Sequence, residues 1–79
     1  MLFYEIIGED NRPAYEADLA GAHKVAKCKR PYALVTVEVV LLDTSKAALA
    51  TWLKTGQPTL TRTGKTYTLT PRGGLNLAE

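Results

Sequence analysis

Four basic side chains lie close together in a stretch of the chain that contains no acidic residue. Residues 19–31 hold these four cations and carry a net charge of +4, whereas residues 1–18 hold five acids and one arginine, a net charge of −4. The four cations are Lys24, Lys27, Lys29 and Arg30. Clustered cations bind phosphates or acidic side chains and speed the encounter with an anionic partner. The cluster therefore predicts a surface that binds a charged partner, not a pocket that converts a substrate.

Other residues extend this predicted surface if the segment that carries them lies beside the cluster. Arg62, Lys65 and Arg72 would add charge, and Tyr32 would add an aromatic contact. A second interpretation stays open, in which the cations only complement the dipole at the C-terminal end of a helix. The residues predicted to bind the partner are Lys24, Lys27, Lys29, Arg30, Tyr32, Arg62 and Lys65.

A second group of residues imitates a nucleotide-binding motif. The sequence Thr63-Gly64-Lys65-Thr66 resembles the end of a phosphate-binding P-loop, which also requires a glycine at position 59. That position is Thr59, and the flanking residues are rich in threonine, which favours strands over the helix that the motif needs. We interpret the segment as the turn of a hairpin.

Other residue types that catalyse reactions or bind metals are too few and too scattered to form a site. His23 and Cys28 are the only histidine and the only cysteine, and a spacing of five places them about 140° apart on a helix. A zinc site needs three or four ligands. We expect Cys28 to be a small core residue, His23 to be solvated, and Glu5, Glu16 and Glu38 to be surface acids. The sequence predicts no catalytic residue, no metal site and no cofactor, and we do not expect an enzyme.

Length and composition indicate a small globular domain. The chain has 79 residues, of which 46% are apolar, and its single cysteine favours a cytoplasmic setting over a secreted one. Its longest apolar stretch, residues 33–42, is too short to cross a bilayer, so we expect no membrane association. The acidic N-terminal residues do not resemble a secretory signal.

The order of turn signals and apolar patterns predicts the secondary structure. Asp18 is a good N-cap for the first helix, Gly56 is suited to end the second, and Val35 begins the better core face of the longest strand. The expected elements are a strand over 2–7, a short strand over 14–17, a helix over 18–29, a strand over 32–42, a helix over 44–55, and a hairpin over 59–70 that turns at Thr63-Gly64.

This order, β(β)αβαββ, predicts a small α+β domain. Two helices would pack on one face of a mostly antiparallel sheet of four or five strands. Residues 1–72 would form the single domain, and residues 73–79 would form a flexible C-terminal tail.

The first 42 residues resemble a family of phage-encoded anti-CRISPR proteins that inhibit type I surveillance complexes. The resemblance rests on the N-terminal strand, Tyr15-Glu16-Ala17, the basic helix with Ala22 and Ala26, and the Val-rich strand after it. Residues from Asp43 onward do not fit this family. The resemblance implies a non-enzymatic inhibitor that places basic residues on a protein–RNA complex and competes with target DNA. It carries over only to Lys24, Lys27, Lys29 and Arg30.

Together these observations predict a binding protein without catalytic activity, which occludes a surface of a larger charged protein or protein–nucleic-acid complex. A phage-encoded inhibitor of a host defence complex, acting in the host cytoplasm, is the leading hypothesis. One alternative is a small regulator that binds nucleic acid directly. Another is an assembly module that pairs through the edge of a strand. The oligomeric state is left open.

Overall fold

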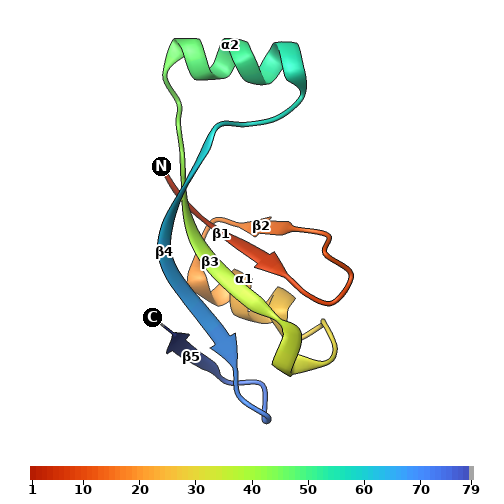
Figure 1. The fold of residues 1–79 in the computed structure, drawn as a ribbon. Coiled ribbons are helices and arrows are strands. Elements are labelled where there is room, and N and C mark those ends of the chain that lie inside the picture. Colours follow the sequence, from red (N-terminus) through yellow and green to blue (C-terminus); the bar gives the residue numbers. More distant parts are fainter. Residues whose placement is uncertain (79) are drawn as a thin grey trace.

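A five-stranded antiparallel sheet, in the strand order β2-β1-β3-β4-β5, forms the body of the chain (Figure 1). The computed structural model describes residues 1–78. The elements are β1 (Leu2–Ile7), β2 (Ala14–Glu16), α1 (Leu19–Ala26), the short 3-10 helix η1 (Tyr32–Leu34), β3 (Thr36–Leu42), α2 (Lys46–Thr55), β4 (Leu60–Leu69) and β5 (Leu75–Ala78). The predicted α+β class and the predicted order of strands and helices are confirmed.

Helix α1 begins where its capping residue predicts and ends earlier than expected. The Asp18 carboxylate accepts the Gly21 N–H at 2.6 Å, which satisfies one of the free amides of the first turn. After Ala26 the helix tightens, because the amides of Cys28 and Lys29 bond to carbonyls three residues back. Three of the four clustered cations therefore follow the helix and do not lie in it.

The core lies between α1 and the sheet. Ile6, Val35 and Val37 are 0–1% exposed, and they form one cluster with the equally buried Ala22 and Ala26 of the helix. The small alanines allow the helix to approach the strands closely. The predicted core face of β3 is confirmed, and each fully buried aliphatic side chain contributes about 1.5–3 kcal/mol.

The predicted hairpin over residues 59–70 is wrong, because β4 is one continuous strand. Its register against β3 shifts in the middle, so that Glu38 pairs with Thr66 but Val40 pairs with Arg62. Gly64, at φ 82°, adopts the left-handed conformation within this bulge. In the sequence Gly64 indicates a turn, but in the structure it lies in a bulge of a long strand.

The predicted tail over residues 73–79 is also wrong for its described part, since β5 is an edge strand of the sheet. The turn before it is closed by the amide of Thr70, which donates to the carbonyl of Gly74 at 2.8 Å. Leu75 then pairs with Leu69 and packs against the core cluster. The domain therefore continues past the predicted boundary at residue 72, and residue 79 lies outside the described residues.

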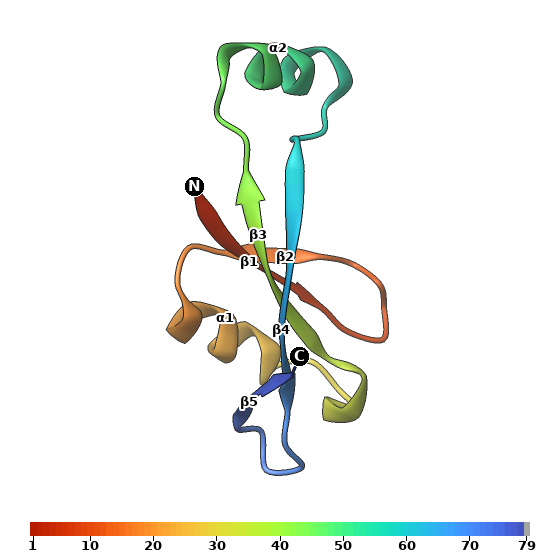
Figure 2. The ribbon, with the colours of Figure 1, turned by 60° about the vertical axis from the view of Figure 1, so that its left-hand side comes forward.

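Helix α2 has a different place from the one expected for it. Only α1 lies against the sheet, whereas α2 stands beyond the ends of β3 and β4, at the opposite end of the molecule from η1 (Figures 1 and 2). The molecule measures 42 × 22 × 19 Å as a result. The Ser45 hydroxyl accepts the Ala48 amide at the start of α2, and Gly56 ends the helix at φ 77°, as its sequence predicts. Neither helix in residues 1–78 has the length and apolar character needed to cross a membrane.

Replacing Ile6 by valine tests whether the α1 face carries the core. Because Ile6 is fully buried, Ile6→Val should lower the free energy of unfolding by about 1 kcal/mol. Ile7→Val, on the next residue of the same strand, should cost about half as much or less, since Ile7 is only half-buried. Chemical denaturation measures both. Equal losses would show that the core does not lie on the α1 face.

Candidate binding surface

The clustered cations lie at the end of the molecule that is farthest from α2. Lys24 is in the last turn of α1, and Lys27, Lys29 and Arg30 follow directly after the helix. Lys24, Lys27 and Arg30 are exposed, whereas Lys29 is half-buried. The structure therefore places three of the four side chains in contact with solvent and gives the fourth another role.

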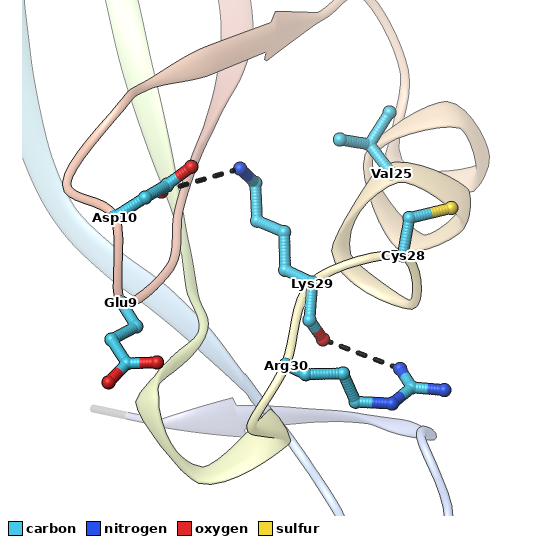
Figure 3. A pocket seen from close by; sticks show the side chains of 6 residues that line it. All are labelled: Glu9, Asp10, Val25, Cys28, Lys29 and Arg30. Atoms are coloured by element: carbon cyan, nitrogen blue, oxygen red, sulfur yellow. Dashed lines mark hydrogen bonds and ion pairs between the residues drawn. The ribbon is translucent and has the colours of Figure 1, made fainter.

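Lys29 connects the end of α1 to the loop between β1 and β2. Its side chain packs over Gly8, where a Cβ atom would lie 3.0 Å from the Lys29 Cδ atom. Its Nζ reaches to 3.8 Å from the Asp10 Oδ1 atom (Figure 3). This ion pair joins the acidic and basic segments of the chain, so part of the opposite charge seen in the sequence is neutralised within the molecule.

Arg30 is held in place by its own segment. Its guanidinium carbon lies 4.2 Å from the centroid of the Tyr32 ring, a cation–π contact. One of its N–H groups donates to the Lys27 carbonyl at 2.7 Å, so the carbonyl at the end of α1 is satisfied by a cation. The charge of Arg30 stays exposed but is fixed in position.

His23 brings a further segment to this end, which corrects the expectation that it is solvated. Its Nε2–H donates to the Gly73 carbonyl at 2.7 Å, and because a carbonyl only accepts, the ring proton lies on Nε2. Gly73 also packs against Tyr32, since a Cβ atom there would lie 3.2 Å from the Tyr32 ring. The exposed Arg72 is therefore held beside the end of α1. We call Lys24, Lys27, Arg30 and Arg72 the cationic end.

A hollow of about 430 Å³ opens beside the cationic end, between α1 and the loop after β1 (Figure 3). Acids line one side of it and cations the other. Its lining residues are Glu9, Asp10, Val25, Cys28, Lys29 and Arg30. Cys28 is exposed here, which corrects the prediction that it is a core residue, because the helix has already ended and its thiol faces away from the sheet (Figure 3). The hollow presents charges of both signs to a ligand.

Arg62 does not belong to the cationic end, contrary to the prediction. One of its N–H groups donates to Glu5 at 2.6 Å and to Glu38 at 2.7 Å. Glu5 and Glu38 alternate with the core residues along their strands, so they lie on the sheet face away from α1. Tyr15 completes the group by donating its hydroxyl proton to Glu5 at 2.7 Å. Two carboxylates of the same domain therefore pair with Arg62, whose side chain stays 55% exposed.

Lys65 is also placed apart from the cluster. It lies in the middle of β4, with its Nζ 5.9 Å from the centroid of the Tyr67 ring. The sequence analysis expected Lys65 and Arg62 to extend the cluster if a hairpin that carries them lay beside it, whereas both residues lie on one long strand of the sheet. Of the predicted residues, the structure brings together Lys24, Lys27, Lys29, Arg30 and Tyr32, and it adds Arg72.

The Glu5 group carries perturbed acidities. The hydrogen bond from Arg62 lowers the pKa of Glu5 below its ordinary value of 4.5, although burial acts in the opposite direction. Burial and the neighbouring Glu5 carboxylate both raise the pKa of Tyr15. These groups are hydrogen-bonded to one another, which indicates a structural role: they keep a carboxylate that is 3% exposed charged and hydrogen-bonded on the sheet face away from α1.

Comparison with known proteins finds no matching family model, curated protein or solved structure. Within residues 1–78, no three histidine, cysteine or acidic side chains lie close enough together to hold a metal ion. This surface presents solvent-exposed cations, of which Arg30 is held in position by Tyr32 and the Lys27 carbonyl.

The Glu5 group predicts a specific loss of stability in acid. Because the folded pKa of Glu5 is lowered, its contribution is complete above about pH 4.5 and is lost as the pH falls through the folded value. The free energy of unfolding should therefore fall as the pH is lowered below about 4.5, and Glu5→Gln should make that fall shallower.

Glu9→Gln is the matched control for this measurement, since Glu9 is an exposed carboxylate on the loop after β1. Its unfolding free energy should fall with acid as steeply as that of the unmodified protein. If Glu5→Gln behaved in the same way as Glu9→Gln, the buried ion pair would make no contribution to folding.

Proposed function

We propose that this chain is a binding protein without catalytic activity, which covers an acidic surface of a larger protein or complex with its cationic end. The proposal rests on one observation. Within residues 1–78, Lys24, Lys27 and Arg30 are exposed and have no acidic group within ion-pair distance, whereas Lys29 and Arg62 are paired with acids of the same domain. The unpaired cations are free to attract an anionic partner, and electrostatic attraction of this kind sets the rate of encounter and its dependence on salt.

The rigidity of the cationic end supports recognition of a surface of fixed shape. His23 attaches the turn before β5 to α1, Lys29 attaches the loop after β1, and Arg30 is stacked on Tyr32. Two segments distant in sequence are thus fastened around the end of one helix. The backbone that carries the cations and the Arg30 side chain are thereby held in place, so less conformational entropy is lost when this surface binds.

Two observations favour an acidic protein surface over a nucleic acid. Binding of single strands relies on aromatic rings on which bases stack, and the ring of Tyr32 is already in contact with Arg30 and Gly73. Glu9 and Asp10 line the adjoining hollow and would repel a phosphate backbone, whereas a protein surface of mixed charge can meet both signs. The resemblance to anti-CRISPR inhibitors supplies a setting for such an occluding protein, and that setting stays a prediction.

Charge reversal at two lysines tests this function. Lys24→Glu with Lys27→Glu should weaken binding to fluorescein-labelled poly-L-glutamate, measured by anisotropy, by about tenfold. This loss corresponds to about 1.4 kcal/mol, as expected when two surface attractions become repulsions. Affinity of the unmodified protein should fall between about 50 mM and about 200 mM NaCl.

The matched control is Lys46→Glu with Lys54→Glu, which makes the same change of net charge at two exposed residues of α2. It should keep most of the affinity, because α2 stands at the other end of the molecule. Equal losses in both variants would show that only net charge matters and would contradict a specific site. A different result would favour the nucleic-acid-binding regulator instead. In that case the protein would bind poly-uridylate more tightly than poly-L-glutamate, and the Lys24→Glu, Lys27→Glu variant would lose this binding.

A further inference from the structure

The apolar stripe of α2 is largely uncovered. At 100° per residue, Ala48, Trp52, Leu49 and Leu53 span an arc of about 140° around the helix. Only Ala48, at one edge of this arc, is buried, and exposure reaches 89% at Leu53, at the other edge. The helix therefore turns the edge of its stripe toward the sheet and presents the rest to solvent. Lys46 and Lys54 lie beyond the Leu53 edge, outside the stripe.

A hollow lies directly beside this stripe, on the sheet face away from α1. Its volume is about 370 Å³, larger than a leucine side chain, and its lining is mostly apolar and aromatic. The lining residues are Phe3, Tyr15, Leu42, Trp52, Gly56, Pro58 and Leu60. A protruding leucine and an apolar hollow are therefore found at the same end of the molecule, which we call the apolar end.

Exposed apolar side chains are concentrated at the apolar end. Of the nine large hydrophobic residues that are exposed, seven lie on α2, on the ends of β1 and β3 next to it, or in the lining of the hollow. They are Met1, Leu2, Tyr15, Leu41, Leu49, Trp52 and Leu53. Leu2 and Leu41 lie on the face of the sheet toward α1, whereas the hollow lies on the other face, next to the stripe of α2. Exposed apolar side chains that gather at one end of a molecule indicate an interface.

The total surface is larger than a compact monomer of this mass exposes. The accessible area is 5403 Å², about 700 Å² more than the roughly 4,700 Å² expected for 8.6 kDa. The radius of gyration, 13.4 Å, likewise exceeds the roughly 11.6 Å expected for 79 residues. The excess area is close to the ~800 Å² that each partner buries in a standard interface.

We propose that the apolar end is the interface of a homodimer, in which α2 of each copy covers the apolar end of the other. A two-fold interface requires a self-complementary patch, and the apolar end carries both the protruding Leu53 and the hollow that can receive it. Lys46 and Lys54, outside the stripe, remain at the solvated rim. This inference does not depend on the proposed function, and it leaves both cationic ends free, because they lie at the far end of the long axis (Figure 1).

Mass measured over a range of protein concentration tests the dimer. Light scattering and sedimentation equilibrium, from about 1 μM to about 1 mM, should give twice the chain mass of 8.6 kDa at the upper end and dissociation on dilution. High salt should not dissociate an apolar interface. Trp52 is the only tryptophan, so its emission should shift to shorter wavelength as the dimer forms.

Leu53→Glu should raise the dissociation constant at least tenfold, because it places a charge in the apolar contact. The variant should keep its fold, checked by circular dichroism, since Leu53 is 89% exposed in the single chain. Leu34→Glu is the matched control, because Leu34 is 54% exposed in η1 at the opposite end. It should dimerise as the unmodified protein does.

Three results would overturn the homodimer. The first is the mass of one chain at every concentration. The second is a dimer that Leu53→Glu and Leu34→Glu leave equally intact. The third is a monomer whose Trp52 emission shifts only when vesicles of phosphatidylcholine and phosphatidylglycerol are added, which would assign the apolar end to a lipid surface.

Discussion

The whole arrangement depends on the packing of one eight-residue helix against one part of a five-stranded sheet. Ala22 and Ala26 pack against Ile6, Val35 and Val37, and these contacts form the only fully buried apolar cluster in residues 1–78. Because the helix is short, it covers one stretch of one face. The turn before β5 and the loop after β1 are held against the end of this helix. Polar side chains on the rest of the sheet need hydrogen-bond partners from elsewhere, as Glu5 does.

This constraint explains why the cations of the chain have two different roles. Arg62 lies on the face away from α1, where it keeps the buried Glu5 charged and hydrogen-bonded, and removal of Arg62 would leave a buried carboxylate without its cation. Lys29 fastens a loop to the helix. Lys24, Lys27 and Arg30 have no such partner in the described residues, and they lie at the C-terminal end of α1, where the negative end of the helix dipole stabilises them. Arg62 and the exposed cations at the end of α1 thus lie on opposite sides of the sheet, whereas Lys29 lies beside those cations.

Local signals in the sequence predicted most of the fold, and they failed where distant segments decide the outcome. Asp18 and Gly56 mark helix ends through hydrogen bonds within a few residues, and the alternation of valines in β3 reports burial on one face, so these predictions are confirmed. Gly64 was misread because a left-handed glycine suits a bulge as well as a turn, and only pairing with β3 distinguishes them. The short β5 gives too few residues for a visible pattern.

At the candidate binding surface, too, local signals were predictive and contacts between distant segments were not. The four clustered cations are adjacent in sequence, so their grouping was predictable. Arg72 lies near them because His23 bonds to Gly73, which is 50 residues away in the sequence. Arg62 lies away from them because β4 is a single strand that pairs with β3. His23, the only histidine, was expected to be solvated, so no signal in the sequence indicated its contact with Gly73.

The most direct test of the cationic end is a nuclear magnetic resonance titration of the labelled protein with poly-L-glutamate. The account predicts that amide shift changes concentrate in residues 24–32 and 72–74, which the structure brings together, and that those of β4 near Arg62 stay small. Changes spread evenly over all the exposed lysines and arginines, or centred on α2, would contradict it.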